Sequence, residues 1–241
     1  MLKIRSITYR NLCLSLLWVC ITCSSCNGVN PEQKPTLDPA LVDQSWLTGT
    51  PCAAPCWYGL EPARSTQEEA FKTTPKLSFI STDTPESLTT TYWDKDAKQY
   101  KVEEAVYYKC KNPSELYCVY QTFRDGLLYQ ILLYPNYEIT FFDAVGQLGE
   151  PTAFTVNRTS PEAKGCIVSI LWEERQMFII YDEGRLSSPY SEDLCDKINK
   201  ESKKVPGNLP IQSVYIESKA LFNELTKQSG YILWNGFIKE K

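Results

Sequence analysis

The chain has 241 residues, which is enough for one large domain or two small ones that each bury a core. Its apolar fraction of 43% and charged fraction of 22% are ordinary for a globular protein and exclude general disorder. The chain contains no histidine, which excludes Ser-His-Asp and Cys-His catalysis, histidine metal ligands and histidine pH switches.

The N-terminus has the pattern of an export signal. Lys3, Arg5 and Arg10 form a basic region without an acid, and the apolar run from Leu12 to Thr22 follows it. A transmembrane helix needs about 20 such residues, and this run has the shorter length of a signal-peptide core. We therefore expect residues 1–25 to be a signal peptide.

Small residues, Ser24 and Ser25, precede Cys26, and this arrangement resembles a bacterial lipobox, in which the cysteine thiol is diacylated and the chain is cut before it. The resemblance implies a palmitate-type lipid anchor at Cys26 and a place on the outer side of a bacterial membrane. Cys23 stands where leucine is usual, and it is a weaker candidate for the modified residue. Secretion with ordinary cleavage nearby and an uncut anchor helix are the alternatives.

The charge of the exported chain argues against a nucleic-acid partner. Cleavage before Cys26 removes three of the 25 basic residues and no acid, which leaves 22 basic against 29 acidic residues and a net charge of −7. Such a surface repels phosphate backbones.

Prolines and polar residues mark residues 26–50 as an extended tether that holds the domain away from the membrane. We expect one α+β domain over residues 51–241, which could consist of two similar α/β sub-units in tandem, 51–135 and 136–241.

Six cysteines follow Cys26, and an even number in an exported protein predicts disulfides. The spacing favours three pairs: Cys52–Cys56, Cys110–Cys118 and Cys166–Cys195. A zinc site and free or mixed thiols are the alternatives, and zinc is disfavoured because no histidine can help and no pair has the usual C-x-x-C spacing.

In the first half of the domain, the capping-box pattern Ser65–Glu68 predicts a short helix that ends before Pro75. A strand is expected at Leu77–Ser81, followed by a polar, turn-rich stretch at Thr82–Thr91. The run Tyr100–Cys110 predicts a strand with Val102, Val106 and Tyr108 on one face. Asp-Gly at 125–126 predicts a hairpin between strands at 117–123 and 127–134.

In the second half, Ile139–Leu148 has apolar residues at helical spacing, with Ile139, Phe142, Val145 and Leu148 on one side, and Gly149 suits the end of a helix. Strands are expected at 153–156, 166–172, 177–181 and 211–216, and a helix at 218–228. The charged stretch 192–210 predicts a surface excursion, and the apolar end 231–237 should dock on the domain. Strands dominate, mostly in antiparallel hairpins with about three short helices, which predicts an α+β fold.

Four segments resemble known envelope proteins: Gly59–Ala70 (GLEPARSTQEEA), Val145–Thr152 (VGQLGEPT), Pro51–Gly59 (PCAAPCWYG) and Trp234–Phe237 (WNGF). The first two are similar to small protein A-like outer-membrane assembly lipoproteins and to β-lactamase-inhibitor-protein-like domains. All four together look like uncharacterised exported bacterial lipoproteins with a P-C-x-x-P-C-W-x-G start. Ala63 departs from the glycine of the pattern, so the backbone there must avoid a positive φ or bear strain.

No catalytic, cofactor-binding or metal-binding motif is present, so we expect a protein that is not an enzyme and carries no cofactor. The leading hypothesis is a lipid-anchored cell-envelope protein that binds another protein or stabilises an envelope assembly. The alternatives are an exported carbohydrate-binding or glycan-acting protein and an inhibitor of an extracellular enzyme. Trp57 and Tyr58, beside the Cys52–Cys56 loop, are the expected contact surface, although Trp57 could equally fill the core.

Overall fold

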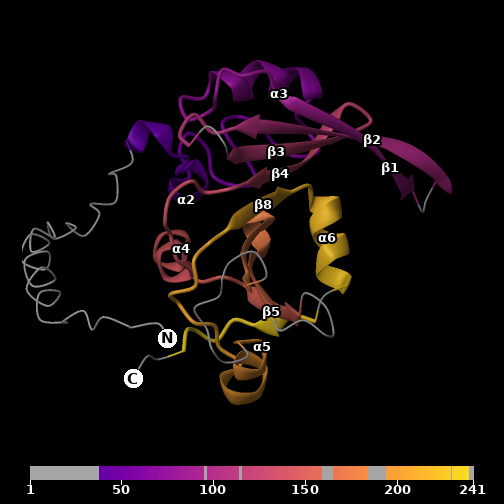
Figure 1. Ribbon diagram of the computed structural model, residues 1–241. Helices are drawn as coiled ribbons and strands as arrows, with labels where there is room; N and C mark the ends of the chain where they lie inside the picture. The colour runs from indigo at the N-terminus through magenta and orange to yellow at the C-terminus, as the bar shows by residue number, and fades with distance from the viewer. Residues whose placement is uncertain are drawn as a thin grey trace, which may run out of the picture. The chain divides into compact units, whose positions relative to one another are not determined.

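The computed structural model describes residues 38–94, 97–113, 116–158, 165–183, 194–228 and 230–238. Within these residues, nine strands form one open antiparallel sheet in the order β1-β2-β3-β4-β8-β7-β6-β5-β9 (Figure 1). Three of the helices have seven residues or more. This is the α+β fold with antiparallel hairpins that the sequence predicts.

The first part of the chain builds one end of the sheet. Its elements are η1 (Pro39–Leu41), α2 (Ser45–Thr48), α3 (Gln67–Thr73), η2 (Thr74–Lys76), β1 (Glu86–Asp94), β2 (Gln99–Lys109), β3 (Tyr117–Arg124) and β4 (Leu127–Leu133). The strands pair in chain order as a four-stranded meander. The predicted hairpin between β3 and β4 is confirmed, because Asp125 and Gly126 turn with φ of 50° and 76°.

The second part repeats this arrangement of a helix followed by four strands. Its elements are α4 (Phe141–Leu148), β5 (Ala153–Arg158), β6 (Cys166–Trp172), η3 (Glu173–Arg175), β7 (Met177–Asp182), α5 (Leu194–Asp196), the π-helical turn η5 (Lys197–Ser202), β8 (Ser213–Glu217), α6 (Lys219–Gln228) and β9 (Ile232–Leu233). The last strands of the two meanders, β4 and β8, pair antiparallel over four residues each and so join the sheet.

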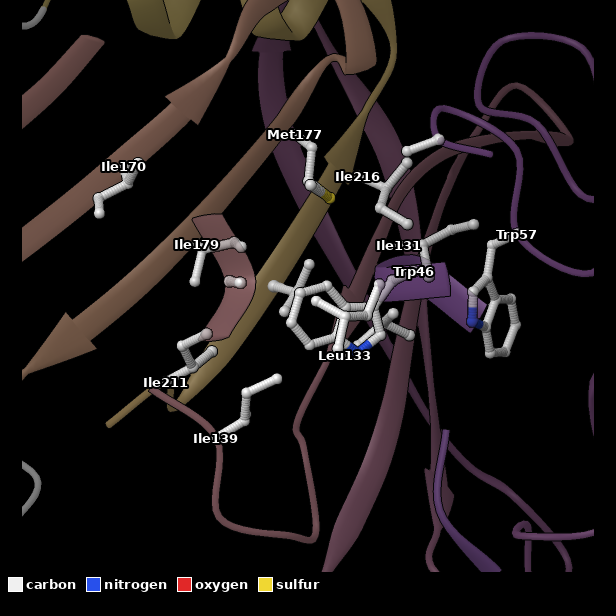
Figure 2. Packing of buried hydrophobic residues seen from close by; sticks show 14 of the residues in the cluster. Trp46, Trp57, Ile131, Leu133, Ile139, Ile170, Met177, Ile179, Ile211 and Ile216 are labelled. Carbon is white, nitrogen blue, oxygen red and sulfur yellow. The ribbon is translucent and has the colours of Figure 1, made fainter. Parts of the chain in front are cut away.

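The two faces of the sheet carry different cores. The larger core lies on the face that holds Ile131, Ile170 and Ile216, and Trp46 and Trp57 from the N-terminal segment pack into it (Figure 2). The smaller core lies on the second face, where Phe222 of α6 packs with Phe178 and other residues of β5, β6 and β7. Helix α6 thus covers the second face over the half of the sheet that the second meander forms.

Three disulfides are present, and they are the pairs that the spacing favours: Cys52–Cys56, Cys110–Cys118 and Cys166–Cys195, with Cα–Cα distances of 5.6, 5.0 and 5.4 Å. Three bridges in one domain point to an oxidising, extracytoplasmic compartment.

The expected tether boundary at residue 50 is wrong for its last part. Trp46 and Leu47 in α2 are buried, at 1% and 6% exposure. Asp43 holds this segment in place, because its carboxylate accepts hydrogen bonds from Ser45 and, at 2.7 Å, from the indole Nε1 of Trp57. Trp46 and Leu47 stand between polar residues in the sequence, so no apolar pattern predicts that they fill the core.

Two strand predictions in the first half are corrected. Residues 77–81 make only one isolated bridge, between Ile80 and Cys110, and form no strand. The stretch 82–91, expected as turns, contains most of β1. Because β1 is an edge strand with mostly exposed residues, it lacks the apolar alternation that marks a half-buried strand.

The capping box of α3 lies one residue later than predicted, and α4 begins two residues later than predicted. The capping box of α3 uses Thr66 and Glu69, because Ser65 Oγ instead accepts a hydrogen bond from the backbone of Glu61 at 3.0 Å. Helix α4 buries Phe141, Ala144 and Leu148 and leaves Phe142 65% exposed. Both Phe142 with Val145 and Phe141 with Ala144 have the spacing of one helix face, so spacing alone does not show which face is buried. The helix that begins after the N-cap Thr140 buries Phe141 and Ala144.

The prediction that the charged stretch 192–210 is a surface excursion is wrong for its described residues, 194–210, because they contribute to the core. Its apolar residues Leu194, Ile198, Val205 and Leu209 are buried in the larger core, and the Cys166–Cys195 bridge ties it to β6. The expected docking of the C-terminal end is confirmed, since Trp234 and Phe237 pack against the same core.

Ala63 adopts the strained alternative that the sequence left open. Its φ is 66°, in the left-handed region that costs an L-residue roughly 1–2 kcal/mol. The conformation is fixed because the Ala63 amide donates to the carbonyl of Leu128 at 2.7 Å.

Replacing Ala63 by glycine should therefore stabilise the protein by roughly 0.5–1 kcal/mol, since relief of strain exceeds the added entropy of the unfolded chain. Thermal unfolding should show a midpoint about 1–3 °C higher. Ala220→Gly in α6 is the matched control and should lower the midpoint. A lower midpoint for Ala63→Gly would contradict the assignment of strain.

Candidate binding surface

The outer ends of β1 and β2 form an arm that projects past the rest of the sheet. Strand β2 pairs with β3 only from Glu103 onward, so residues 91–94 and 99–102 pair only with each other. Figure 1 shows both strands running beyond β3 and β4. We call these residues the arm.

One side of the arm is apolar and exposed. Trp93, Tyr100 and Val102 are 50%, 72% and 59% exposed, and the rings of Trp93 and Tyr100 contact each other at 5.1 Å between centroids. The prediction that Val102, Val106 and Tyr108 share a face is right, but only Val106 and Tyr108 are buried. Val102 is exposed because the arm runs past β3 and past the core beneath it.

On the other side of the arm, Arg124 is held between two tyrosine rings. Its guanidinium carbon lies 4.0 Å from the ring centroid of Tyr92 and 3.8 Å from that of Tyr129, and its Nε donates to Glu103. Cation–π contacts of this kind fix a long side chain in one orientation. Arg124 is therefore a rigid part of the surface.

These residues line a cleft of about 580 Å³ between the arm, the β3–β4 turn and α6. Trp93, Asp94, Asp125 and Glu224 also line it. Lys101 at its edge pairs with Asp94 at 2.9 Å and with Asp125 at 3.3 Å, and these partners raise the pKa of the lysine. The cleft thus combines aromatic rings with several carboxylates.

Glu217 at the end of β8 is a buried carboxyl group near Arg124. Its side chain has 0% exposure, Oε1 accepts a hydrogen bond from Gln130 at 2.7 Å, and Oε2 has no hydrogen-bond partner. Burial raises the pKa of Glu217 to about 7, while the Gln130 hydrogen bond and the positive charge of Arg124 oppose the rise.

Of the expected contact surface at Trp57 and Tyr58, Trp57 takes the alternative role of filling the core. Trp57 has 0% exposure and packs against Phe79, so it belongs to the core and cannot touch a partner. Tyr58 is half-buried against the same ring, and burial together with the charge of Asp43 raises its pKa to about 12. Asp43 itself is buried, which raises its carboxyl pKa against the hydrogen bonds from Ser45 and Trp57.

No cluster of three or more cysteine, aspartate or glutamate side chains suited to a metal ion occurs among the described residues. The six cysteines considered for zinc are in disulfides instead. In the same part of the chain, no helix is long and apolar enough to cross a membrane.

Sequence reasoning missed the arm, Arg124 and Glu217. The arm lies partly in the stretch expected as turns. The cation–π stack was missed because Tyr92, Arg124 and Tyr129 come from three different strands, β1, β3 and β4. The only signal for Glu217 is its place at the end of an apolar strand, which does not show that the side chain is buried.

Comparison of the chain with models of protein families, with curated proteins and with solved structures found no match.

Glu217 should make the protein less stable as the pH rises. Its folded pKa of about 7 lies above the value of 4.5 for an unperturbed glutamate, so its contribution to stability is complete below about pH 4.5 and is lost as the pH rises through 7. Between pH 5 and pH 8, wild type should lose roughly 3 kcal/mol relative to Glu217→Gln. Urea unfolding at several pH values measures this difference.

Glu224→Gln removes an exposed carboxyl group that lines the cleft near Arg124 and is the control, whose stability should follow wild type across the pH range. Parallel pH profiles for wild type and Glu217→Gln would mean that Glu217 does not titrate in this range.

Proposed function

We propose that the chain is a lipid-anchored, extracytoplasmic binding protein without catalytic activity, which captures another protein with its arm. The observation that carries the proposal is the exposure of Trp93, Tyr100 and Val102 on a projecting hairpin. Exposed contiguous apolar residues commonly mark interaction sites. Tryptophan, tyrosine and arginine are also the residues that contribute most to binding at protein interfaces.

The rigidity of the arm favours binding. The Trp93–Tyr100 contact and the Lys101 ion pairs hold its side chains before a partner arrives. Side chains that are already ordered lose little entropy on association. The proposal that the protein is a lipoprotein rests on Cys26 and its neighbours and on the resemblance to exported lipoproteins, and the three disulfides support export.

Carbohydrate binding is the second candidate function. The specific observation in its favour is the cleft, because Tyr92 and Tyr129 offer ring faces and Asp94 and Glu224 offer carboxylates to hydroxyl groups. A flat or convex partner surface would use the apolar side of the arm, whereas a sugar would enter the cleft on its other side.

Removal of the two exposed rings should abolish capture of the partner. We expect Trp93→Ala/Tyr100→Ala to retain at least about 30-fold less of the protein that wild type retains from its native envelope, because the loss of even one ring that contributes about 2 kcal/mol has this effect. The matched control is Leu233→Ala on β9, which is 78% exposed and lies at the opposite edge of the sheet. Chemical cross-linking followed by mass spectrometry identifies and quantifies the partner.

Equal capture by the arm variant and by wild type would overturn the protein-binding proposal. Soluble oligosaccharides from the same envelope test the second candidate. Tyr129→Ala should weaken their binding if the cleft holds a sugar, and it should leave capture of a protein by the apolar side unchanged.

Lipid anchoring is tested at its own residue. Cys26→Ala should leave an uncut precursor and remove acyl groups from the protein, because the thiol is the proposed point of attachment. Mass spectrometry of the N-terminal peptide from wild type should show an acylated Cys26. A wild-type N-terminus that begins elsewhere, without an acyl group, would contradict this proposal.

A further inference from the structure

A second aromatic site lies at the other end of the first meander, away from the arm. A pocket of about 320 Å³ is lined by the rings of Tyr107, Tyr117 and Tyr134, together with Leu116, Pro135 and other residues. Tyr107 and Tyr117 come from β2 and β3, and Tyr134 directly follows β4. Helix α6 covers the second face of the other half of the sheet and does not line this pocket.

The rings of Tyr107 and Tyr117 are held by neighbouring side chains before any ligand arrives. Tyr107 contacts Tyr117 at 5.4 Å and Tyr120 at 4.6 Å between centroids, so it is held from two sides. The Cys110–Cys118 bridge ties β2 to β3 beside the pocket. The side-chain amide nitrogen of Asn136 donates to the carbonyls of Leu41 and Asn112. The pocket wall therefore consists mainly of rings and alkyl groups.

A carboxylate stands beside these rings. The hydroxyl of Tyr117 donates to Glu86 Oε2 at 2.5 Å, and this hydrogen bond, together with Lys109, lowers the pKa of Glu86. The Nζ of Lys109 lies 3.2 Å from Glu86 Oε1 and 6.0 Å from the ring centroid of Tyr117. One cation of the protein thus already lies near the ring cluster.

We propose that this pocket, which we call the tyrosine cage, binds a quaternary ammonium group such as that of choline. Aromatic faces carry negative potential and attract cations, and cages of aromatic rings are a known means of binding quaternary ammonium ligands. A primary ammonium would lose hydrogen bonds to water in this apolar pocket, whereas a quaternary one has no N–H to satisfy. The volume is within the range of small-ligand sites. The inference is independent of the proposed function of the arm.

Calorimetric titration of the full-length, oxidised protein tests the cage. Choline should bind at least tenfold more tightly than its neutral carbon isostere, 3,3-dimethylbutan-1-ol, which has the same shape without the charge. Tyr134→Ala should weaken choline binding about tenfold, and Tyr134→Phe, which keeps the ring, should bind choline nearly as well as wild type does. Tyr100→Ala on the arm is the matched control and should leave choline binding unchanged.

Lys109→Met provides a test with the opposite sign. It removes a competing cation and leaves Glu86 in place, so choline should bind more tightly than to wild type. Competition with dihexanoyl-phosphatidylcholine below its micellar concentration distinguishes the sources of the group. If dihexanoyl-phosphatidylcholine displaces choline and dihexanoyl-phosphatidylglycerol does not, the cage accepts a choline lipid headgroup. If neither lipid competes, the cage accepts only the free cation.

Equal binding of choline and its neutral isostere would overturn the proposal, because the site would then recognise shape alone. Absence of choline binding, or binding that Tyr134→Ala leaves unchanged, would overturn it as well. Normal capture of a protein partner by the arm in the same preparation would show that the protein is folded and that only the inference about the cage has failed.

Discussion

The pairing of β4 with β8 is the interaction on which the rest of the structure depends. These strands end the two meanders, and their antiparallel register places Ile131 opposite Ile216 and Leu133 opposite Val214. All four side chains belong to the larger core, which therefore continues across the junction. A four-stranded meander with one apolar face must bury that face, and the shared core does so for both.

This arrangement leaves the second face unevenly covered. Helix α6 follows β8 directly and packs Phe222 against the strands of the second meander. The same face of the first meander keeps its rings accessible, with Arg124 between Tyr92 and Tyr129 at one end and Tyr107 beside Tyr117 at the other. The rings of the cleft and of the tyrosine cage are thus accessible because, in the described part of the chain, the only long helix on this face lies over the other half, whereas Trp93, Tyr100 and Val102 on the opposite side are exposed because the arm runs past the core.

The sequence predicts the fold well where local chemistry decides and poorly where tertiary packing does. Asp125-Gly126 needs no distant partner to form its turn, and the cysteine spacings limit their own pairing. By contrast, β1 lacks a regular alternation of apolar and polar residues because it is mostly exposed, so its β-branched and aromatic residues are the only local sign of a strand. Of the expected contact surface, Trp57 is packed in the core, where its indole N–H donates to Asp43, fourteen residues away, a partner that no local pattern predicts.

Native-state hydrogen exchange tests the central claim most directly, since it compares the junction with the arm in one experiment. If β4 and β8 join the meanders into one cooperative unit, their paired amides, such as those of Ile131 and Ile216, should exchange only through global unfolding, whereas arm amides near Tyr100 exchange faster by local opening. The account predicts one common free energy of opening for β3, β4, β7 and β8. Exchange of the two meanders with separate free energies, or of the junction as fast as the arm, would contradict it.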